Sequence, residues 1–338
     1  MSDSNNLGKQ ETLDLTSLQL ITVPQSVTKH MLLKRLVLDE NVLTELPDWM
    51  DVLTELEELH LDNNKLSELP PSLSHLAKLQ IFSARANNLK VLPDFIWQLN
   101  DLKHLSIGQN PLHVLPEQIG DLYDLTQLYV HDNELTAVPT TIGQLTNLEI
   151  LDLGHNLLTA VPPTIGSLHN LKTLYLSDNQ LSTLPNTFSN LNSLCYLGLT
   201  HNQFTELPSL IGNLTNLQEL RLYHNQLTTL PDSIGSLTRL KELHLMNNRL
   251  HTLPDTVGNL TSLTHLDLRN NRLKSLPGTM RQLQNLTFLD LRANRLNTLP
   301  NWLADLPNLT KLDLRWNKLW TPPSWFNQLE QRGCTIYQ

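Results

Sequence analysis

Residues 220–240 read LRLYHNQLTTLPDSIGSLTRL, and close variants of this stretch follow one another along almost the whole chain. Each copy carries an asparagine in the pattern Leu-x-x-Leu-x-Leu-x-x-Asn-x-Leu-x-x-Leu-Pro, and the asparagines recur every 23 residues. They are Asn41, Asn64, Asn87, Asn110, Asn133, Asn156, Asn179, Asn202, Asn225, Asn248, Asn271, Asn294 and Asn317. A fixed period of roughly 20 to 50 residues predicts a solenoid of stacked coils.

The start of each copy predicts a short strand. Leu220 and Leu222 alternate with polar neighbours, so both leucines point into the core, while Glu219, Arg221 and Tyr223 point outward. Strands of successive coils then stack into a parallel sheet on the concave side. The outward positions of this sheet are the ones that the repeat does not dictate.

The rest of each copy predicts a turn and an irregular return path. The asparagine amide is expected to be buried and bonded to backbone groups of its own and neighbouring coils, because an unbonded buried amide costs roughly 1 to 3 kcal/mol. A proline six residues later disfavours a long helix. Glycines on the return path are expected to permit a tight turn. They are Gly120, Gly143, Gly166, Gly212, Gly235 and Gly258.

The segment Leu-Pro-x-x-Ile-Gly-x-Leu-x-x-Leu after each asparagine resembles the repeat of the intracellular Ras-group leucine-rich repeat proteins of animals, plants and bacteria. The resemblance covers residues 12 to 338. It implies an α/β-type leucine-rich repeat solenoid of about 14 coils, a curved right-handed coil with a concave parallel sheet and a convex side of extended or 3₁₀ segments. It also implies a non-catalytic scaffold that holds a small GTPase, phosphatase, kinase or similar protein.

Departures from the pattern predict caps at both ends. Residues 1–11 are expected to be a disordered tail, residues 12–317 the solenoid, and residues 318–338 a C-terminal cap. The first coil has Leu18 in place of asparagine and serves as the N-terminal cap. Trp320, Trp325 and Phe326 are expected to form a lid over the last coil. The inward pair that ends in Ile336 is expected to arrive one residue early.

The charge is unevenly distributed along the chain. Residues 1–170 hold 22 acidic and 9 basic residues, a net charge of −13, whereas residues 171–338 hold 11 and 15, a net charge of +4; together they give the total of −9. An acidic chain repels polyanions, so nucleic acid is not an expected partner. The more basic half is better suited to attract an acidic protein.

Several features favour the cytoplasm. The sequence has no stretch of roughly 18 apolar residues that could span a membrane, and its first residues lack the basic and apolar regions of a secretion signal. The two cysteines, Cys195 and Cys334, are six coils apart. At ~4.8 Å per coil this separation is on the order of 29 Å, which excludes a disulfide between them. A reducing compartment is therefore expected.

The first candidate binding surface lies at outward strand positions in the middle of the chain. Tyrosine and arginine dominate the energetics of protein interfaces, although outward aromatics in strands also pack simply against one another. Gly108, Gly154 and Gly198 are interpreted as leaving room for a partner. The candidate residues are Tyr129, His131, Tyr175, Tyr196, Arg221, Tyr223, His224, His244 and Met246.

A second candidate surface is charged and lies in the last coils. Acidic and basic residues alternate in Asp-x-Arg pairs, which predicts a surface network of ion pairs, each contributing no more than about 1 kcal/mol. Docking of an acidic partner is the alternative. The pairs are Asp267 with Arg269, Asp290 with Arg292, and Asp313 with Arg315, flanked by Arg272, Arg295 and Lys318.

Enzymatic activity is not expected, since the sequence contains none of the phosphate-loop, nucleophile-elbow or zinc-protease motifs. No cofactor is expected. The only metal hypothesis is that His201 and His224 touch one ion together, and two ligands make a weak site. The leading interpretation is a protein-interaction scaffold. The alternative is a bacterial effector or surface protein that recognises a host protein or glycan.

Overall fold

A computed structural model of the chain describes residues 11–318 and 322–338. The expected disordered tail, apart from residue 11, lies outside these residues, as does Trp320. The chain divides into two compact units, unit 1 from Met1 to Leu171 and unit 2 from Lys172 to Gln338. None of the helices in the described residues is long and apolar enough to cross a membrane.

The described residues of unit 1 form seven short strands, each paired in parallel with the next. The strands are β1 (Thr12–Asp14), β2 (Arg35–Val37), β3 (Glu58–His60), β4 (Ile81–Ser83), β5 (His104–Ser106), β6 (Gln127–Tyr129) and β7 (Ile150–Asp152). The return paths are 3₁₀ helices: η2 (Gln25–Lys29), η3 (Asp48–Val52), η4 (Pro71–His75), η5 (Asp94–Gln98), η6 (Glu117–Asp121), η7 (Thr140–Gln144) and η8 (Pro163–Ser167).

Unit 2 repeats this arrangement, with eight parallel strands in the part of it that the structure describes. They are β8 (Thr173–Tyr175), β9 (Tyr196–Gly198), β10 (Glu219–Arg221), β11 (Glu242–His244), β12 (His265–Asp267), β13 (Phe288–Asp290), β14 (Lys311–Asp313) and β15 (Thr335–Tyr337). Its helices are η9 (Asn186–Asn190), η10 (Ser209–Asn213), η11 (Asp232–Ser236), η12 (Asp255–Asn259), η13 (Gly278–Gln282), η14 (Asn301–Asp305) and α1 (Phe326–Gln331).

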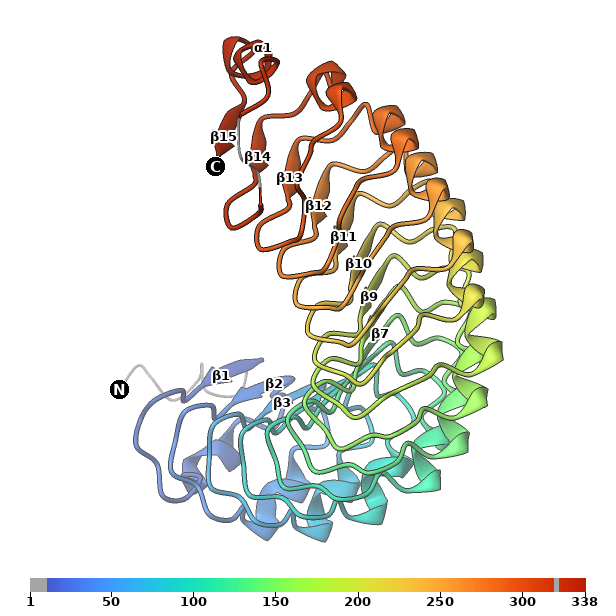
Figure 1. Cartoon of the computed structure of the whole chain (residues 1–338). Coiled ribbons are helices and arrows are strands. Elements are labelled where there is room, and N and C mark those ends of the chain that lie inside the picture. Colours follow the sequence, from blue (N-terminus) through green and yellow to red (C-terminus); the bar gives the residue numbers. More distant parts are fainter. Residues whose placement is uncertain (1–10, 319–321) are drawn as a thin grey trace. The chain divides into compact units, whose positions relative to one another are not determined.

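Within each unit the strands line the concave side and the 3₁₀ helices line the convex side (Figure 1). Each 3₁₀ helix begins directly after a proline, whose fixed φ suits the extended residue before a helix. The leucines of strand and turn fill the space between the two sides; Leu220 and Leu222, for example, are fully buried. This repeated strand and 3₁₀ helix confirms the predicted leucine-rich repeat solenoid.

The ladder asparagines are bonded as predicted. Asn225 donates from Nδ2 to the carbonyl oxygens of Leu199 (2.9 Å) and Leu222 (3.0 Å), and its Oδ1 accepts from the backbone N–H of Phe204 (3.1 Å). Leu199 and Phe204 belong to the preceding coil. Each amide therefore satisfies backbone groups that neither strand nor helix can pair, and it ties two coils together.

The glycines of the return path have a different role from the one predicted. Among glycines of the described residues, only Gly333 has a left-handed φ, so a tight turn is not what requires them. Instead, an added Cβ at Gly235 would lie 2.5 Å from the carbonyl oxygen of Thr256 in the next coil. An added Cβ at Gly143 would likewise lie 2.5 Å from the carbonyl oxygen of Thr164. Glycine is needed here because adjacent 3₁₀ helices approach each other closely.

Replacement of Gly235 by alanine should therefore lower the free energy of unfolding by about 2 kcal/mol, because the backbone of Thr256 must shift to make room. Gly278 offers the matched control, since nothing lies within 4 Å of its added Cβ. Gly278→Ala should leave stability unchanged or raise it by up to about 0.5 kcal/mol through the unfolded state. Urea unfolding of the two variants measures both. Equal stability of the two would contradict the close-approach explanation.

The ends of the chain depart from the repeat. In the first coil Leu18 is exposed, and its backbone N–H donates to Oδ1 of Asn41, so the second coil supplies the missing amide contact. Near the other end Trp325 and Phe326 are buried, with ring centroids 4.8 Å apart. Ile336 pairs in register with Leu312, 24 residues earlier. The prediction of an early inward pair is wrong; because the last coil holds α1 in place of the 3₁₀ helix, its strand comes one residue late.

Candidate partner-binding face

Two of the nine candidate residues lie on the strand face of unit 1. The ring of Tyr129 lies 5.3 Å from that of His104, and its hydroxyl donates to Oε1 of Gln127. Nδ1 of His131 lies 3.3 Å from a carboxylate oxygen of Asp152, and the interaction with this carboxylate raises the pKa of His131. Both side chains therefore make contacts within unit 1.

Two of the three strand-face glycines, Gly108 and Gly198, do not leave room for a partner, contrary to the expectation from the sequence. An added Cβ at Gly108 would lie 2.8 Å from the ring of His131, so that ring already occupies the space. At Gly198 the neighbours are Oγ of Ser177 (3.1 Å) and the ring of Tyr196 (3.3 Å). These two glycines accommodate large side chains of their own unit, because outward side chains of adjacent strands compete for the same surface.

In unit 2, Tyr175, Tyr196 and Arg221 form one cluster. The two tyrosine rings lie 4.8 Å apart, and the guanidinium of Arg221 lies 5.5 Å from the centre of the Tyr196 ring. Burial raises the pKa of Tyr196 to about 12. Glu219 accepts a 2.5 Å hydrogen bond from Nε of Arg221. A partner that covers this cluster would contact two aromatic rings and the guanidinium of Arg221, which Glu219 and Tyr196 already hold in place.

A second cluster joins His201, Tyr223 and His224. The two histidine rings stack with centroids 4.2 Å apart and planes 15° apart, and Tyr223 meets each ring edge-on. Both histidines precede a ladder asparagine and have positive φ, which turns their side chains to the same edge of the sheet. Burial lowers the pKa of His224, and neighbouring His201 lowers it further.

The stacking argues against the weak hypothesis that His201 and His224 bind one metal ion together. The lone pairs of an imidazole lie in the plane of its ring, so two nearly parallel stacked rings cannot direct them at one point. The nitrogens are also engaged elsewhere: Nδ1 of His201 lies 3.3 Å from Asp178, and Nε2 of His224 lies 2.8 Å from Nδ2 of Asn247. This pair is an aromatic contact surface.

His244 and Met246, the last two candidates, contact charged side chains. Nε2 of His244 lies 3.1 Å from Oε2 of Glu242. The sulfur of Met246 accepts a hydrogen bond from Nε of Arg269 at 3.0 Å. Met246 thereby connects the candidate face of unit 2 to the Asp-x-Arg pairs.

The Asp-x-Arg pairs are ion pairs, as predicted, but they are not a surface network. The carboxylates of Asp290 and Asp313 are only 1% exposed, and Arg292, 21% exposed, contacts both, at 2.6 Å and 3.3 Å. Arg315 binds Asp313 at 2.6 Å. The hydrogen bond to Asp290 raises the pKa of Arg292. Because both carboxylates are almost fully buried, the value of about 1 kcal/mol for exposed pairs does not apply to them.

The first of these pairs is looser. Nε of Arg269 lies 3.2 Å from Asp267. Burial raises the pKa of Asp267. The charged series in unit 2 therefore tightens toward the C-terminal coils, where two carboxylates share one guanidinium.

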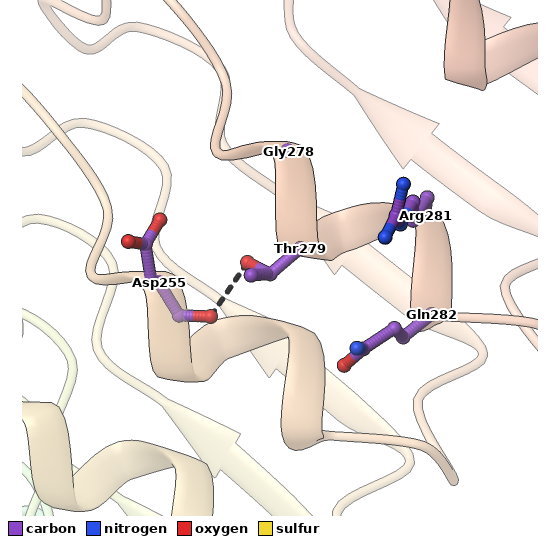
Figure 2. Close-up of a pocket in the computed structure, with 5 residues that line it drawn as sticks. All are labelled: Asp255, Gly278, Thr279, Arg281 and Gln282. Atoms are coloured by element: carbon purple, nitrogen blue, oxygen red, sulfur yellow. Dashed lines mark hydrogen bonds between the residues drawn. The ribbon is translucent and has the colours of Figure 1, made fainter.

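Three pockets in the described residues lie away from the strand face. Figure 2 shows a pocket of about 320 Å³ between η12 and η13, where Thr279 donates to the backbone carbonyl of Asp255 at 2.6 Å. Gly278 opens this space because it carries no side chain. Arg281 and Gln282 complete the lining. Pockets of about 480 Å³ and 430 Å³ in unit 1 follow the repeated Leu-Pro segments. The polar side chains that line these three pockets all belong to the repeated Leu-Pro and 3₁₀ segments.

Three residues of the strand face were not among the predicted binding residues. Glu219 was predicted only to point outward, Glu242 was not singled out, and His201 was considered only as half of a metal pair. The available signal was the 23-residue register, which places Glu219 beside Glu242 and Arg221 beside His244 on the neighbouring strand. Which of these neighbours pair depends on rotamers, and the register alone does not determine them.

Comparison with known families identifies the chain. A leucine-rich repeat region profile matches residues 186–270, and leucine-rich repeat profiles match residues 55–76, 146–204 and 261–319. A leucine-rich repeat protein of Leptospira interrogans is 37% identical, with a TM-score of 0.90, over 95% of this chain and 82% of that one. The chain belongs to the leucine-rich repeat family. No curated protein sequence matches it significantly.

Other solved structures share the fold over part of their length. The plant peptide hormone receptor RGFR1, in complex with RGF2, is 31% identical with a TM-score of 0.79, over 91% of this chain and 52% of that chain. A chain of the Drosophila Toll–Spätzle complex is 27% identical with a TM-score of 0.80, over 93% of this chain and 45% of that chain. The chain thus spans about half the length of these two proteins.

Proposed function

We propose that this chain is a non-catalytic scaffold that binds a protein partner on the strand face of unit 2. The observation that carries the proposal is the pair of aromatic clusters on that face, Tyr175 with Tyr196 and Arg221, and His201 with Tyr223 and His224. These rings fill no core, and tyrosine and arginine are the residue types that dominate interfaces. The leucine-rich repeat fold itself supports protein–protein interaction.

The proposed partner is a signalling protein, such as a small GTPase, and the proposed location is the cytoplasm. Both follow from the resemblance of the repeats to the Ras-group type, to which we assign the chain. The complex of RGFR1 with RGF2 supports the general idea that a related fold holds a polypeptide. Unit 2 carries the more basic part of the sequence, which favours a partner with an acidic surface.

The second candidate function is recognition of a host protein or glycan by an exported bacterial protein. The 37% identity to a Leptospira interrogans protein favours this candidate, since it is the highest identity among these structures and comes from a bacterium. Fractionation of producing cells distinguishes the two. Recovery of the chain outside the cell supports the second candidate, and its retention in the cytoplasm supports the first.

Tyr223→Ala and Arg221→Glu should each weaken binding of the captured partner by about 2 kcal/mol, roughly thirtyfold. Tyr223→Ala removes the ring that meets both histidines, and Arg221→Glu reverses the one cation of the other cluster. Arg239→Glu is the matched control, because Arg239 is exposed outside the strands. Partners captured from source-cell lysate by the wild type would be measured individually by titration. Undiminished binding by both strand-face variants would refute a role for this face.

A further inference from the structure

The strand face of unit 2 contains one group of side chains with the composition of a metal site. Glu219 begins β10, whereas Glu242 begins and His244 ends β11. Glu219 and Glu242 are direct partners in the parallel register, and residues 242 and 244 project from the same side of one strand. One ligand atom from each of the three lies within 4.8 Å of the others. Two neighbouring strands therefore present three donors to one point.

The distances give this group its shape. Nε2 of His244 lies 3.1 Å from Oε2 of Glu242 and 3.9 Å from Oε1 of Glu219. All three residues are half-buried, so the donors are held by the strands and still face solvent. A divalent ion between these atoms would replace contacts of about this length with coordination bonds of roughly 2.0 to 2.2 Å. Small rotations of three side chains would bring the donors that close.

We propose that Glu219, Glu242 and His244 form a binding site for a divalent transition-metal ion of the zinc class. One imidazole nitrogen and two carboxylate oxygens suit such an ion, and two carboxylates balance its charge. Calcium takes six to eight oxygen ligands and magnesium prefers octahedral oxygen coordination, so a three-residue site with a nitrogen donor disfavours both. A fourth position stays open to water or to a side chain of a bound protein.

Arg221 fits this site as an outer partner of Glu219. Its Nε donates to Oε1 of Glu219 at 2.5 Å, while its guanidinium rests against the ring of Tyr196. Ligating carboxylates are commonly hydrogen-bonded in this way, which fixes their orientation. The positive charge of Arg221 also repels a metal cation, so the metal affinity of this site is lower than that of a site with acidic neighbours alone.

Zinc titration of the full chain by calorimetry tests the proposal. The wild type should bind Zn²⁺ at this site, and His244→Ala and Glu242→Gln should each weaken that binding by at least about tenfold. Calcium and magnesium should bind much more weakly. His113→Ala is the matched control, since Nδ1 of His113 lies 3.2 Å from a carboxylate oxygen of Glu134, outside both aromatic clusters. This control should leave the zinc affinity unchanged.

Thermal unfolding without metal should show that the variants keep the wild-type fold. Zn²⁺ should raise the unfolding temperature of the wild type and of His113→Ala only. The proposal is overturned if the wild type binds no zinc, if His244→Ala binds it as well as the wild type, or if only His113→Ala loses it. Zinc binding requires no protein partner. Its absence would leave the proposed scaffold function standing, and loss of partner binding would leave the metal site standing.

Discussion

Replacing Asn225 with alanine should lower the free energy of unfolding by roughly 3 kcal/mol. The amide donates to the carbonyl oxygens of Leu199 and Leu222 and accepts from the N–H of Phe204, and all these groups are buried. Alanine leaves them without partners and without access to water. Because the contacts join two coils, the loss also weakens the interface on which a solenoid depends.

Urea unfolding followed by circular dichroism measures this effect. Asn213→Ala is the matched control, since the same side chain is removed and Asn213 is exposed at the end of η10. The control should cost no more than about 0.5 kcal/mol, as surface substitutions generally do. A similar loss in both variants would mean that the ladder amide contributes nothing beyond helix and turn propensity.

The second large effect is expected for Arg292→Ala, which should lower the free energy of unfolding by about 3 kcal/mol. Arg292 binds the carboxylate of Asp290 at 2.6 Å and reaches that of Asp313 at 3.3 Å, and both carboxylates are 1% exposed. Its removal leaves Asp290 buried without its cation. Asp313 keeps Arg315, which holds the expected loss at the lower end of the range for broken buried pairs.

Arg281→Ala provides the comparison, because Arg281 lies exposed at the end of η13 in the same unit. It should change the free energy of unfolding by less than about 0.5 kcal/mol. If Arg292→Ala changes the free energy of unfolding as little as Arg281→Ala, the buried carboxylates must take up protons or water without penalty. The ion pairs would then contribute no more to stability than exposed pairs do. Unfolding at several salt concentrations adds a second readout, since a buried pair is screened less than an exposed one.

The repeat is the part of the molecule that could be predicted from the chain alone. Strand positions such as Leu220 and Leu222, the buried amide of Asn225 and the 3₁₀ helix after Pro231 all follow from a pattern of period two, a buried polar group and a fixed φ. These are local rules, and the 23-residue register then places each residue beside its equivalent in the next coil.

The details that differ all concern contacts between coils. Gly235 is needed because Thr256 of the next coil lies against it, and its own φ is ordinary. Gly108 makes room for His131, and Ile336 comes one residue late because α1 replaces a 3₁₀ helix. A pattern within one coil contains no information on how closely the next coil approaches, so these reasons could not be derived from it.

The solenoid, its period, the inward leucines and the columns of outward residues can all be derived from the amino-acid pattern, because each follows from backbone periodicity. The roles of the outward residues became clear only in three dimensions. The tertiary structure buried the carboxylates of Asp290 and Asp313, stacked His201 on His224, and brought Glu242 to His244. The physical reason is that side chains on neighbouring strands lie close enough to pair in several ways, and packing and charge in three dimensions select among them.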